Sequence, residues 1–506
     1  MTLHRPHELS RRGFLATAAA AVAAGAARAP SPADAEGASP AGRPINVLVL
    51  LGDDMGFHLG CAGTQGVVTP HLDRLVADGV LFERAYAPAA SCSPCRASLL
   101  TGRYPHSHGI ITNVHPVGVT APASAWERGA AWRGPYGVPP DVPTAPECFK
   151  EAGYRTGLTN KGHVGPGWKF PWDERAVWQY TLDRAAEDNR PGTYHGARRF
   201  FENAGHTPFF LYANLTLTHR PFRAHAPEVS RLPAPDPSQV AVPPWLPDLP
   251  PVRRDWARYL DTIQMTDSQA GEILAALDDA GHRDDTLVVF AADHGIAWHR
   301  AKATVYEAGT HIPVIVRGPG VRRGARVADL VSLIDLLPTL LEACALPVPD
   351  GMEGRSILDL LQGRSGAAGR DLVFAEHNAH GPTPREFYPS RAVRGRRFKY
   401  IRNLLPEKTY VPPADLVEKK RWNNLTWNAV QECAGSFPVQ HALAQRTLRR
   451  PPEELYDLHT DPHEMTNLLE GGRETLTPYV REELARLRQA LDAWMKATGD
   501  AGADLM

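Results

Sequence analysis

Three nearly continuous apolar runs stand out in the sequence, at residues 44–51, 208–215 and 286–292. Runs of this kind are typical of strands buried on both faces of a largely parallel sheet. Further strands are predicted at residues 80–86, 154–159 and 312–317, and helices at residues 70–78, 146–152, 258–280 and 330–345. The alternation predicts an α/β fold in which helices sandwich a large, mixed, mostly parallel sheet.

The pattern changes near Gly369. Short strand-like runs follow at residues 372–376, 390–393, 399–401 and 454–458, and an amphipathic helix is predicted at residues 479–495. The chain of 506 residues is long enough for one large core and a smaller companion. We therefore predict an N-terminal domain at residues 44–368 and a smaller C-terminal α+β subdomain at residues 369–506.

The first residues carry a different signal. The stretch Ser10-Arg11-Arg12-Gly13-Phe14-Leu15 precedes an alanine-rich apolar run that extends to Ala27. This arrangement predicts a twin-arginine export signal in residues 1–35, removed near Ala29 or Ala35. The run is shorter than the ~18 apolar residues of a membrane-spanning helix, so a membrane anchor is the weaker interpretation. We expect a periplasmic or extracellular protein without stable membrane insertion.

Two of the buried runs end in acidic residues. Asp53 and Asp54 follow the first run, and Asp293 with His294 follows the third. Carboxylates at the end of a buried strand repel one another and lose solvation, so they are costly unless a cation holds them. We favour a metal site, and an aspartate pair that caps a helix or forms a turn is the alternative.

Residues 91–103 read Ser-Cys-Ser-Pro-Cys-Arg-Ala-Ser-Leu-Leu-Thr-Gly-Arg, which predicts a short helix. Ser93 can cap this helix, the proline suits its first turn, and Gly102 offers the left-handed residue that ends it. Cys92 is then expected just outside the helix N-terminus, with Arg96 one turn along. Unpaired N–H groups and the helix dipole favour an anion at that position.

Cys92 and Cys95 also match a redox Cys-x-x-Cys motif, in which a helix N-terminus lowers a thiol pKa by the same physics. Taken alone, residues 92–95 do not decide between an anion-binding helix N-terminus and a redox motif. A redox domain needs only about 100 residues around its motif, whereas this chain has 506. The remaining cysteines are scattered and do not resemble a disulfide framework.

Basic residues and histidines follow the acidic and apolar segments at several points. Lys161 and His163 come directly after one predicted strand, His219 follows another, and Lys302 lies shortly after the second acidic strand end. Each of these residues on its own is typical of a solvated loop. The position of Lys161 and His163 just after a strand, at the sheet edge that carries Asp53, favours a functional role for that pair.

The motif Cys-x-Pro-x-Arg, followed by leucine, Thr-Gly and a basic residue, resembles the signature of type I sulfatases, which have an alkaline phosphatase-like fold. The resemblance implies that a formylglycine-generating enzyme oxidises Cys92 to formylglycine (3-oxoalanine), whose hydrated aldehyde is the nucleophile. Many members have serine where Cys95 stands, so this thiol could form a disulfide or compete during maturation. The resemblance extends from Pro44 to the C-terminal helix and implies that the C-terminal strands form a small antiparallel sheet.

The resemblance also implies one divalent cation. Its expected ligands are Asp53, Asp54, Asp293, His294 and the modified Cys92. Ca²⁺ is the expected ion, although many members have asparagine where His294 stands. An imidazole nitrogen suits Mn²⁺ or Zn²⁺ better than Ca²⁺, so those two ions stay open.

The remaining candidates receive catalytic roles from the resemblance. Arg96 and Lys161 are expected to neutralise the charge of the sulfuryl group. His219 or Lys302 would protonate the leaving atom, and His163 would take the proton of the second hydroxyl of the nucleophile.

The family resemblance implies a hydrolase of sulfuric esters or sulfamates that acts on a sulfated carbohydrate. The runs at residues 91–102 and 163–166 look closest to the heparan N-sulfatases (sulfamidases), which implies N-sulfoglucosamine as the substrate. Glu376, His377 and His380 are candidates for the rim of the substrate site.

Two other functions stay open. A phosphonate monoester or phosphodiester hydrolase would share the formylglycine and the fold. A non-catalytic protein that binds sulfated glycans would result if Cys92 is never converted. The net charge of −1 gives no reason to expect nucleic-acid binding.

Overall fold

The computed structural model of the protein describes residues 44–114, 137–176, 189–381, 383–418, 422 and 424–505. The export signal predicted in residues 1–35 lies outside this range. Within the described parts of the chain, every helix is too short or too polar to span a membrane.

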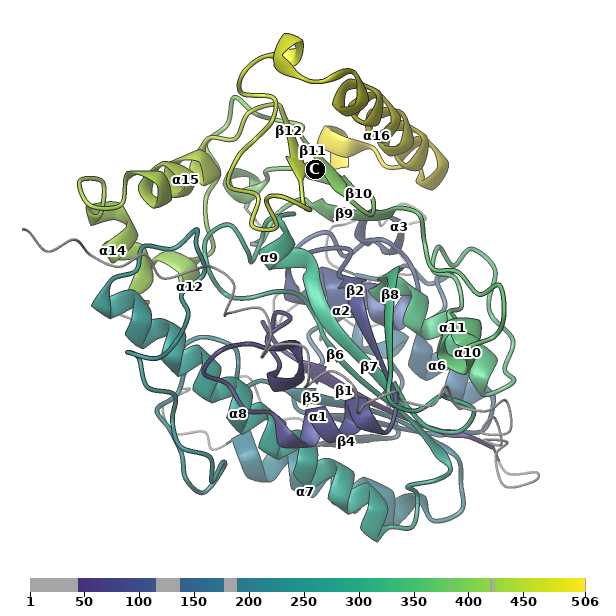
Figure 1. The fold of residues 1–506 in the computed structure, drawn as a ribbon. Helices are drawn as coiled ribbons and strands as arrows, with labels where there is room; N and C mark the ends of the chain where they lie inside the picture. The colour runs from purple at the N-terminus through teal and green to yellow at the C-terminus, as the bar shows by residue number, and fades with distance from the viewer. Residues whose placement is uncertain are drawn as a thin grey trace, which may run out of the picture. The chain divides into compact units, whose positions relative to one another are not determined.

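Six of the eight strands of the main sheet coincide closely with the predicted runs, and the strands at residues 174–176 and 325–332 were not predicted. The eight strands are β1 (Asn46–Gly52), β2 (Val80–Tyr86), β3 (Arg155–Thr159), β4 (Glu174–Ala176), β5 (Phe209–Leu215), β6 (Thr286–Ala292), β7 (His311–Arg317) and β8 (Ala325–Ser332). Their order is β4-β3-β5-β1-β6-β7-β2-β8 (Figure 1). Only β7 runs against its two neighbours, β6 and β2, among these strands. The predicted large, mixed, mostly parallel sheet is confirmed.

Helices pack on both faces of this sheet (Figure 1). One layer contains α1 (Pro70–Ala77), α7 (Asn189–Ala204) and α8 (Pro250–Asp279), and the other contains α2 (Cys92–Thr101), α6 (Ala145–Glu151) and α10 (Leu336–Ala343). Side chains from the sheet and from both layers form one large hydrophobic cluster. Further helices are α3 (Pro105–His108), α9 (Glu307–Thr310), α11 (Leu358–Gln362), α12 (Ala414–Val417), α14 (Thr426–Glu432) and α15 (Pro438–Leu448).

The prediction of one helix over residues 330–345 is wrong at its start. Residues up to Ser332 belong to β8, and α10 begins at Leu336. The run is apolar across this boundary, so periodicity cannot separate the strand from the helix. The carboxylate of Asp335 accepts the Ser332 N–H at 2.9 Å and caps the turn between them.

The C-terminal strands form a second, antiparallel sheet, as predicted. It contains β9 (Val373–His377), β10 (Ser390–Arg394), β11 (Phe398–Asn403) and β12 (Glu453–Asp457) in the order β12-β11-β10-β9. One face packs against the last long helix, α16 (Pro478–Thr498). The other face packs against Val305 and Tyr306, which lie in the segment after β6. The small sheet therefore supports a segment of the main domain.

The domain boundary between residues 368 and 369 stays a prediction, because the described residues on both sides of it belong to one compact unit. The predicted helix at residues 479–495 corresponds to α16. Its buried face consists of Leu484, Leu487, Leu491 and Trp494.

Replacing Leu487 by alanine should lower the free energy of unfolding by about 3 kcal/mol, because it leaves a cavity between α16 and the small sheet. Urea denaturation measures this change. Gln489→Ala, at an exposed position of the same helix, is the control and should stay within about 0.5 kcal/mol of the parent. Equal effects of the two changes would contradict the packing described for α16.

Candidate active site

The two acidic strand ends lie side by side. β1 and β6 pair in parallel with Gly52 opposite Ala292, so Asp53 and Asp293 are adjacent. The Asp293 N–H donates to the Gly52 carbonyl at 2.9 Å. The Asp54 N–H donates to the Asp293 carboxylate at 3.0 Å, which turns Asp54 toward the same point. The structure thus brings three fully buried carboxylates together.

The helix α2 places Cys92 and Arg96 against these carboxylates. It begins two residues earlier than expected, because the Cys95 N–H donates to the Ser91 carbonyl at 3.0 Å and makes Ser91 the N-cap residue. Cys92 is therefore the first residue of the helix, and Ser93 does not cap it. The Ser93 hydroxyl instead accepts a hydrogen bond from the Val114 N–H at 2.9 Å.

The guanidinium of Arg96 connects the two strand ends. Its Nε donates to Asp293 at 3.0 Å, and its Nη2 donates to Asp53 at 2.9 Å. Its Nη1 donates to the side-chain carbonyl of Asn214, at the end of β5, and to the Lys161 carbonyl at 3.1 Å. One buried arginine therefore joins the ends of three strands through charge-assisted hydrogen bonds.

Two lysines complete the ion pairs. The Lys161 Nζ lies 2.8 Å from both carboxylate oxygens of Asp53. The Lys302 Nζ lies 2.7 Å from Asp54 and 2.8 Å from Asp415, which belongs to α12. His219 lies beside this lysine, with 3.5 Å between its Nε2 and the Lys302 Nζ.

His294 is oriented as a metal ligand would be. Its Nδ1 lies 2.9 Å from the Gly295 carbonyl, so Nδ1 carries the proton in that hydrogen bond and Nε2 is the nitrogen that would bind a cation. The Nε2 lies 3.4 Å from the Cys92 Sγ and 3.2 Å from Asp54. This set of carboxylates, imidazole and sulfur converges on one point, and its donors fit a divalent cation.

The surrounding charges favour a negative group at position 92. Burial alone would raise the pKa of the Cys92 thiol, but Lys161 and Lys302 hold it well below its usual value. Burial would likewise raise the pKa of Asp53, and the same Lys161, helped by Arg96, holds it below its usual range. An anion that approaches Cys92 therefore meets fixed positive charge.

His163 lies beside Cys92 and hydrogen-bonds to its side chain. Burial lowers the pKa of His163 to about 4, so its imidazole is neutral near pH 7. Its backbone has a φ of 52°, in the left-handed region that is uncommon outside glycine. The fold thus holds a neutral base beside position 92.

All the predicted catalytic and metal residues therefore meet in one place. The three candidates for the rim of the substrate site lie in different surroundings. His380 lies 3.2 Å from the Ser91 hydroxyl and 3.1 Å from the Asn113 amide, next to the site. Glu376 is fully buried and binds His106, away from the site. His377 is also buried, and its ring packs edge-on against that of Tyr410.

Cys95 does not pair with Cys92. Every cysteine in the described chain is a free thiol, and the Cys95 Sγ donates to the Asp293 carbonyl. The predicted disulfide alternative is therefore absent from this structure, and the second thiol serves as a hydrogen-bond donor behind the acidic strand end.

Arg96→Lys should lower the free energy of unfolding by about 3 kcal/mol and reduce turnover, because lysine cannot reach both aspartates and Asn214 at once. Chemical denaturation and steady-state kinetics on the same preparation measure both effects. The control is Arg103→Lys, which changes a residue just beyond the same helix; among the described residues, its guanidinium donates to the Asp350 carbonyl, at 3.3 Å. A fully stable and active Arg96 variant would contradict the role described for this residue.

Comparison with known proteins agrees with this site. The model of the Sulfatase family matches residues 45–345, and the model described as N-sulphoglucosamine sulphohydrolase, C-terminal, matches residues 293–417. The N-sulphoglucosamine sulphohydrolase of Homo sapiens is 30% identical over 498 residues, an alignment that covers 90% of this chain and 92% of that protein.

Two solved structures share the fold. One, determined in complex with its substrate D-glucosamine-2-N,6-O-disulfate, is 17% identical with a TM-score of 0.64, over 91% of this chain and 99% of that chain. The phosphonate monoester hydrolase from Silicibacter pomeroyi is 21% identical with a TM-score of 0.63, over 90% of this chain and 96% of that chain. These two likenesses show the fold alone. The family match and the similarity to the human relative show more: this chain belongs to the sulfatase family.

Proposed function

We propose that this sulfatase removes the N-linked sulfate of N-sulfoglucosamine in heparan-type glycans, with Cys92 acting after its conversion to formylglycine. The observation that carries the proposal is the position of Cys92, at the start of a buried helix where Lys161, Lys302 and Arg96 meet the acidic strand ends. The human relative is named for this substrate, and its similarity covers most of both chains.

The positive groups of the site would compensate the negative charge of the sulfuryl group, which is the main obstacle to the reaction. A sulfuryl group is anionic and repels nucleophiles, so fixed cations are needed to stabilise the charge that develops on its oxygens. Lys161 and Lys302 are already held in place by Asp53 and Asp54, so they need little reorganisation when substrate binds. Each well-placed donor of this kind is worth roughly 3 kcal/mol of barrier.

Proton transfers are assigned to the groups around position 92. Formylglycine supplies a hydrated aldehyde with two hydroxyl groups, one to attack sulfur and one to lose a proton afterwards. Neutral His163 is placed to accept that proton. Lys302 and its neighbour His219 are placed to donate a proton to the leaving nitrogen or oxygen.

A divalent cation at Asp53, Asp54, Asp293 and His294 would supply Lewis-acid stabilisation of negative charge on the sulfuryl oxygens. We propose Ca²⁺, because oxygen atoms form most of the donor set. His294 is the group that would favour Mn²⁺ or Zn²⁺ instead.

Export through the twin-arginine pathway is part of the proposal. That pathway carries folded proteins, which suits an enzyme whose nucleophile must be made before export. Mature protein in the periplasm or medium, beginning after residue 29 or 35, would support this route.

A phosphonate monoester or phosphodiester hydrolase is the second candidate. The structural likeness to the phosphonate monoester hydrolase from Silicibacter pomeroyi favours it. Rates on N-sulfoglucosamine, an O-sulfated glucosamine, an aryl sulfate and an aryl phosphodiester separate the candidates. We expect the highest kcat/KM on N-sulfoglucosamine, and a preference for the phosphodiester would reject the first proposal.

Cys92→Ala should lower turnover at least about a thousandfold, because it removes the nucleophile. Cys95→Ser is the matched control on the same helix and should retain activity, since serine can also donate to the Asp293 carbonyl. Intact mass of the peptide that spans position 92, without alkylation, should reveal an aldehyde or its hydrate. Two thiols with measurable disulfide exchange would support the redox interpretation instead.

Removal of metal by a chelator should abolish turnover, and Ca²⁺ should restore it, because the donor set is rich in carboxylate oxygen. Metal analysis of the untreated protein should give about one divalent cation per chain, the stoichiometry of a single site. Replacing His294 by asparagine, an oxygen donor, should increase the affinity for Ca²⁺. Restoration by Mn²⁺ or Zn²⁺ but not by Ca²⁺ would overturn the choice of ion.

A further inference from the structure

The catalytic residues differ in how far solvent reaches their side chains. Cys92, Lys161 and Lys302 are buried, together with the acidic strand ends. His163 and His219 are partly exposed, and the side chain of His219 is 11% exposed. The part of a substrate that does not react stays outside the buried pocket. It therefore has to lie against the accessible edge that these two histidines mark.

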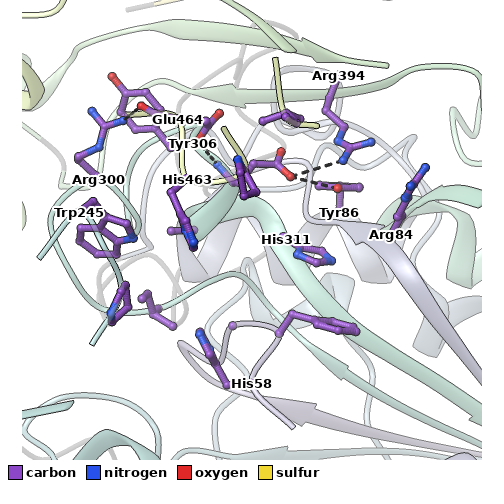
Figure 2. A pocket seen from close by; sticks show the side chains of 18 of the residues that line it. His58, Arg84, Tyr86, Trp245, Arg300, Tyr306, His311, Arg394, His463 and Glu464 are labelled. Atoms are coloured by element: carbon purple, nitrogen blue, oxygen red, sulfur yellow. Dashed lines mark hydrogen bonds and ion pairs between the residues drawn. The ribbon is translucent and has the colours of Figure 1, made fainter. Parts of the chain in front are cut away.

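A cavity of about 370 Å³ lies in the same part of the fold (Figure 2). Its lining includes Ile296 and Arg300, from the segment that leads to Lys302, but none of the catalytic residues. Within it, Glu307 is paired with Arg394 at 3.7 Å (Figure 2). Because no proton donor of the reaction faces this cavity, it is not the space that receives the leaving group.

Trp422 extends the accessible edge beyond His219. The two ring centres lie 6.1 Å apart, and the ring planes are tilted by 51°. The indole is partly exposed, as the imidazole is. His219 adjoins Lys302, and these two residues are the assigned proton donors to the leaving atom. A sugar attached to that atom therefore extends toward the indole.

Buried hydrogen bonds fix the chain on both sides of Trp422. Before it, the Asp415 carboxylate accepts from the Lys302 Nζ at 2.8 Å. After it, the Asn424 amide donates to the Asp415 carbonyl at 3.2 Å and to the Leu416 carbonyl at 2.7 Å. Asn424 is 2% exposed, so breaking these bonds would leave buried polar groups unpaired.

The same part of the chain is connected to His219. The Thr426 hydroxyl donates to the Asp255 carboxylate at 2.6 Å. That carboxylate also accepts two hydrogen bonds from the Arg220 guanidinium, at 3.0 and 2.7 Å, and Arg220 directly follows His219. One buried ion pair thus anchors the segments that carry both rings. Such support keeps a binding surface in place before the ligand arrives.

An indole suits a sugar ring at this position. One face of a pyranose presents C–H groups, which pack against an aromatic face, while its hydroxyl groups remain at the edge. A tryptophan side chain also offers a large contact area at a low cost in conformational entropy. A small anion such as free sulfate fills only the charged pocket and gains nothing from this surface.

We propose that Trp422 is a specificity-determining residue of this sulfatase, which packs against the ring of the sugar that carries the leaving atom. The inference rests on the proposed function, because it takes the leaving group to be a sugar. It goes further by naming the residue that recognises the ring, whether the sulfate is linked through nitrogen or oxygen.

The test is Trp422→Ala, with Trp422→Phe as the variant that keeps an aromatic face. For a disaccharide ending in N-sulfoglucosamine, KM should rise about tenfold in the alanine variant and about threefold or less in the phenylalanine variant. The kcat should stay within about threefold, because the proton donors remain. Trp427→Ala is the matched control: this partly exposed tryptophan of α14 packs near His299, with 5.7 Å between ring centres, and its loss should leave KM unchanged.

Inorganic sulfate separates the wall from the pocket. As a competitive inhibitor it should keep its Ki within about twofold in Trp422→Ala, because it occupies only the charged pocket. An equal loss of affinity for sulfate and for the disaccharide would overturn the inference, since it would indicate general damage to the site.

Calorimetry in a Cys92→Ala background, which prevents turnover, measures binding alone. Adding Trp422→Ala should weaken disaccharide binding about tenfold. Equal affinity with and without this change would overturn the inference and leave the proposed function intact. A parent enzyme that prefers an aryl phosphodiester to every sulfated sugar would instead reject the proposed function, and the inference with it.

Discussion

The active site depends on the compensation of buried charge at the ends of β1 and β6. Three aspartates there are removed from water, and two lysines and Arg96 lie within ion-pair distance of them. Removing one member of such a pair costs about 3–5 kcal/mol, because it leaves its partner buried and uncompensated. The lysines and the arginine that would stabilise a sulfuryl group thus also stabilise the strand ends. Replacing one of these residues will change turnover and folding stability together.

The second sheet gives this cluster mechanical support. Val305 and Tyr306 follow Lys302 closely in the sequence, and they pack into the face of the small sheet opposite α16. Asp415, which pairs with Lys302, also comes from the C-terminal part of the chain. The C-terminal residues therefore contribute to the active site: Asp415 pairs with Lys302, and the ring of Trp422 lies 6.1 Å from that of His219.

Most of the fold and much of the site could be predicted from local patterns, because buried strands need apolar runs and isolated carboxylates at strand ends need cations. Asn214 lies one residue before the end of β5, at the same sheet edge as Asp53, so attention to polar residues at strand ends could have found it. Asp415 carries no such signal, since it lies in one turn of helix that tertiary contacts bring to Lys302. The predicted helix start at residue 330 was wrong for a related reason. An apolar run alone does not indicate whether its residues pair as a strand or pack as a helix.

The burial of Cys92 has a consequence for the order of events in biosynthesis. Its side chain is 1% exposed, and every residue of α2 is buried with it. A second protein could not reach this side chain in the folded state without opening the helix and breaking the ion pairs around Arg96. Any enzymatic oxidation of Cys92 must therefore act on the nascent or unfolded chain, and folding then encloses the product. A chain that folds before this oxidation would therefore keep an unmodified thiol at Cys92.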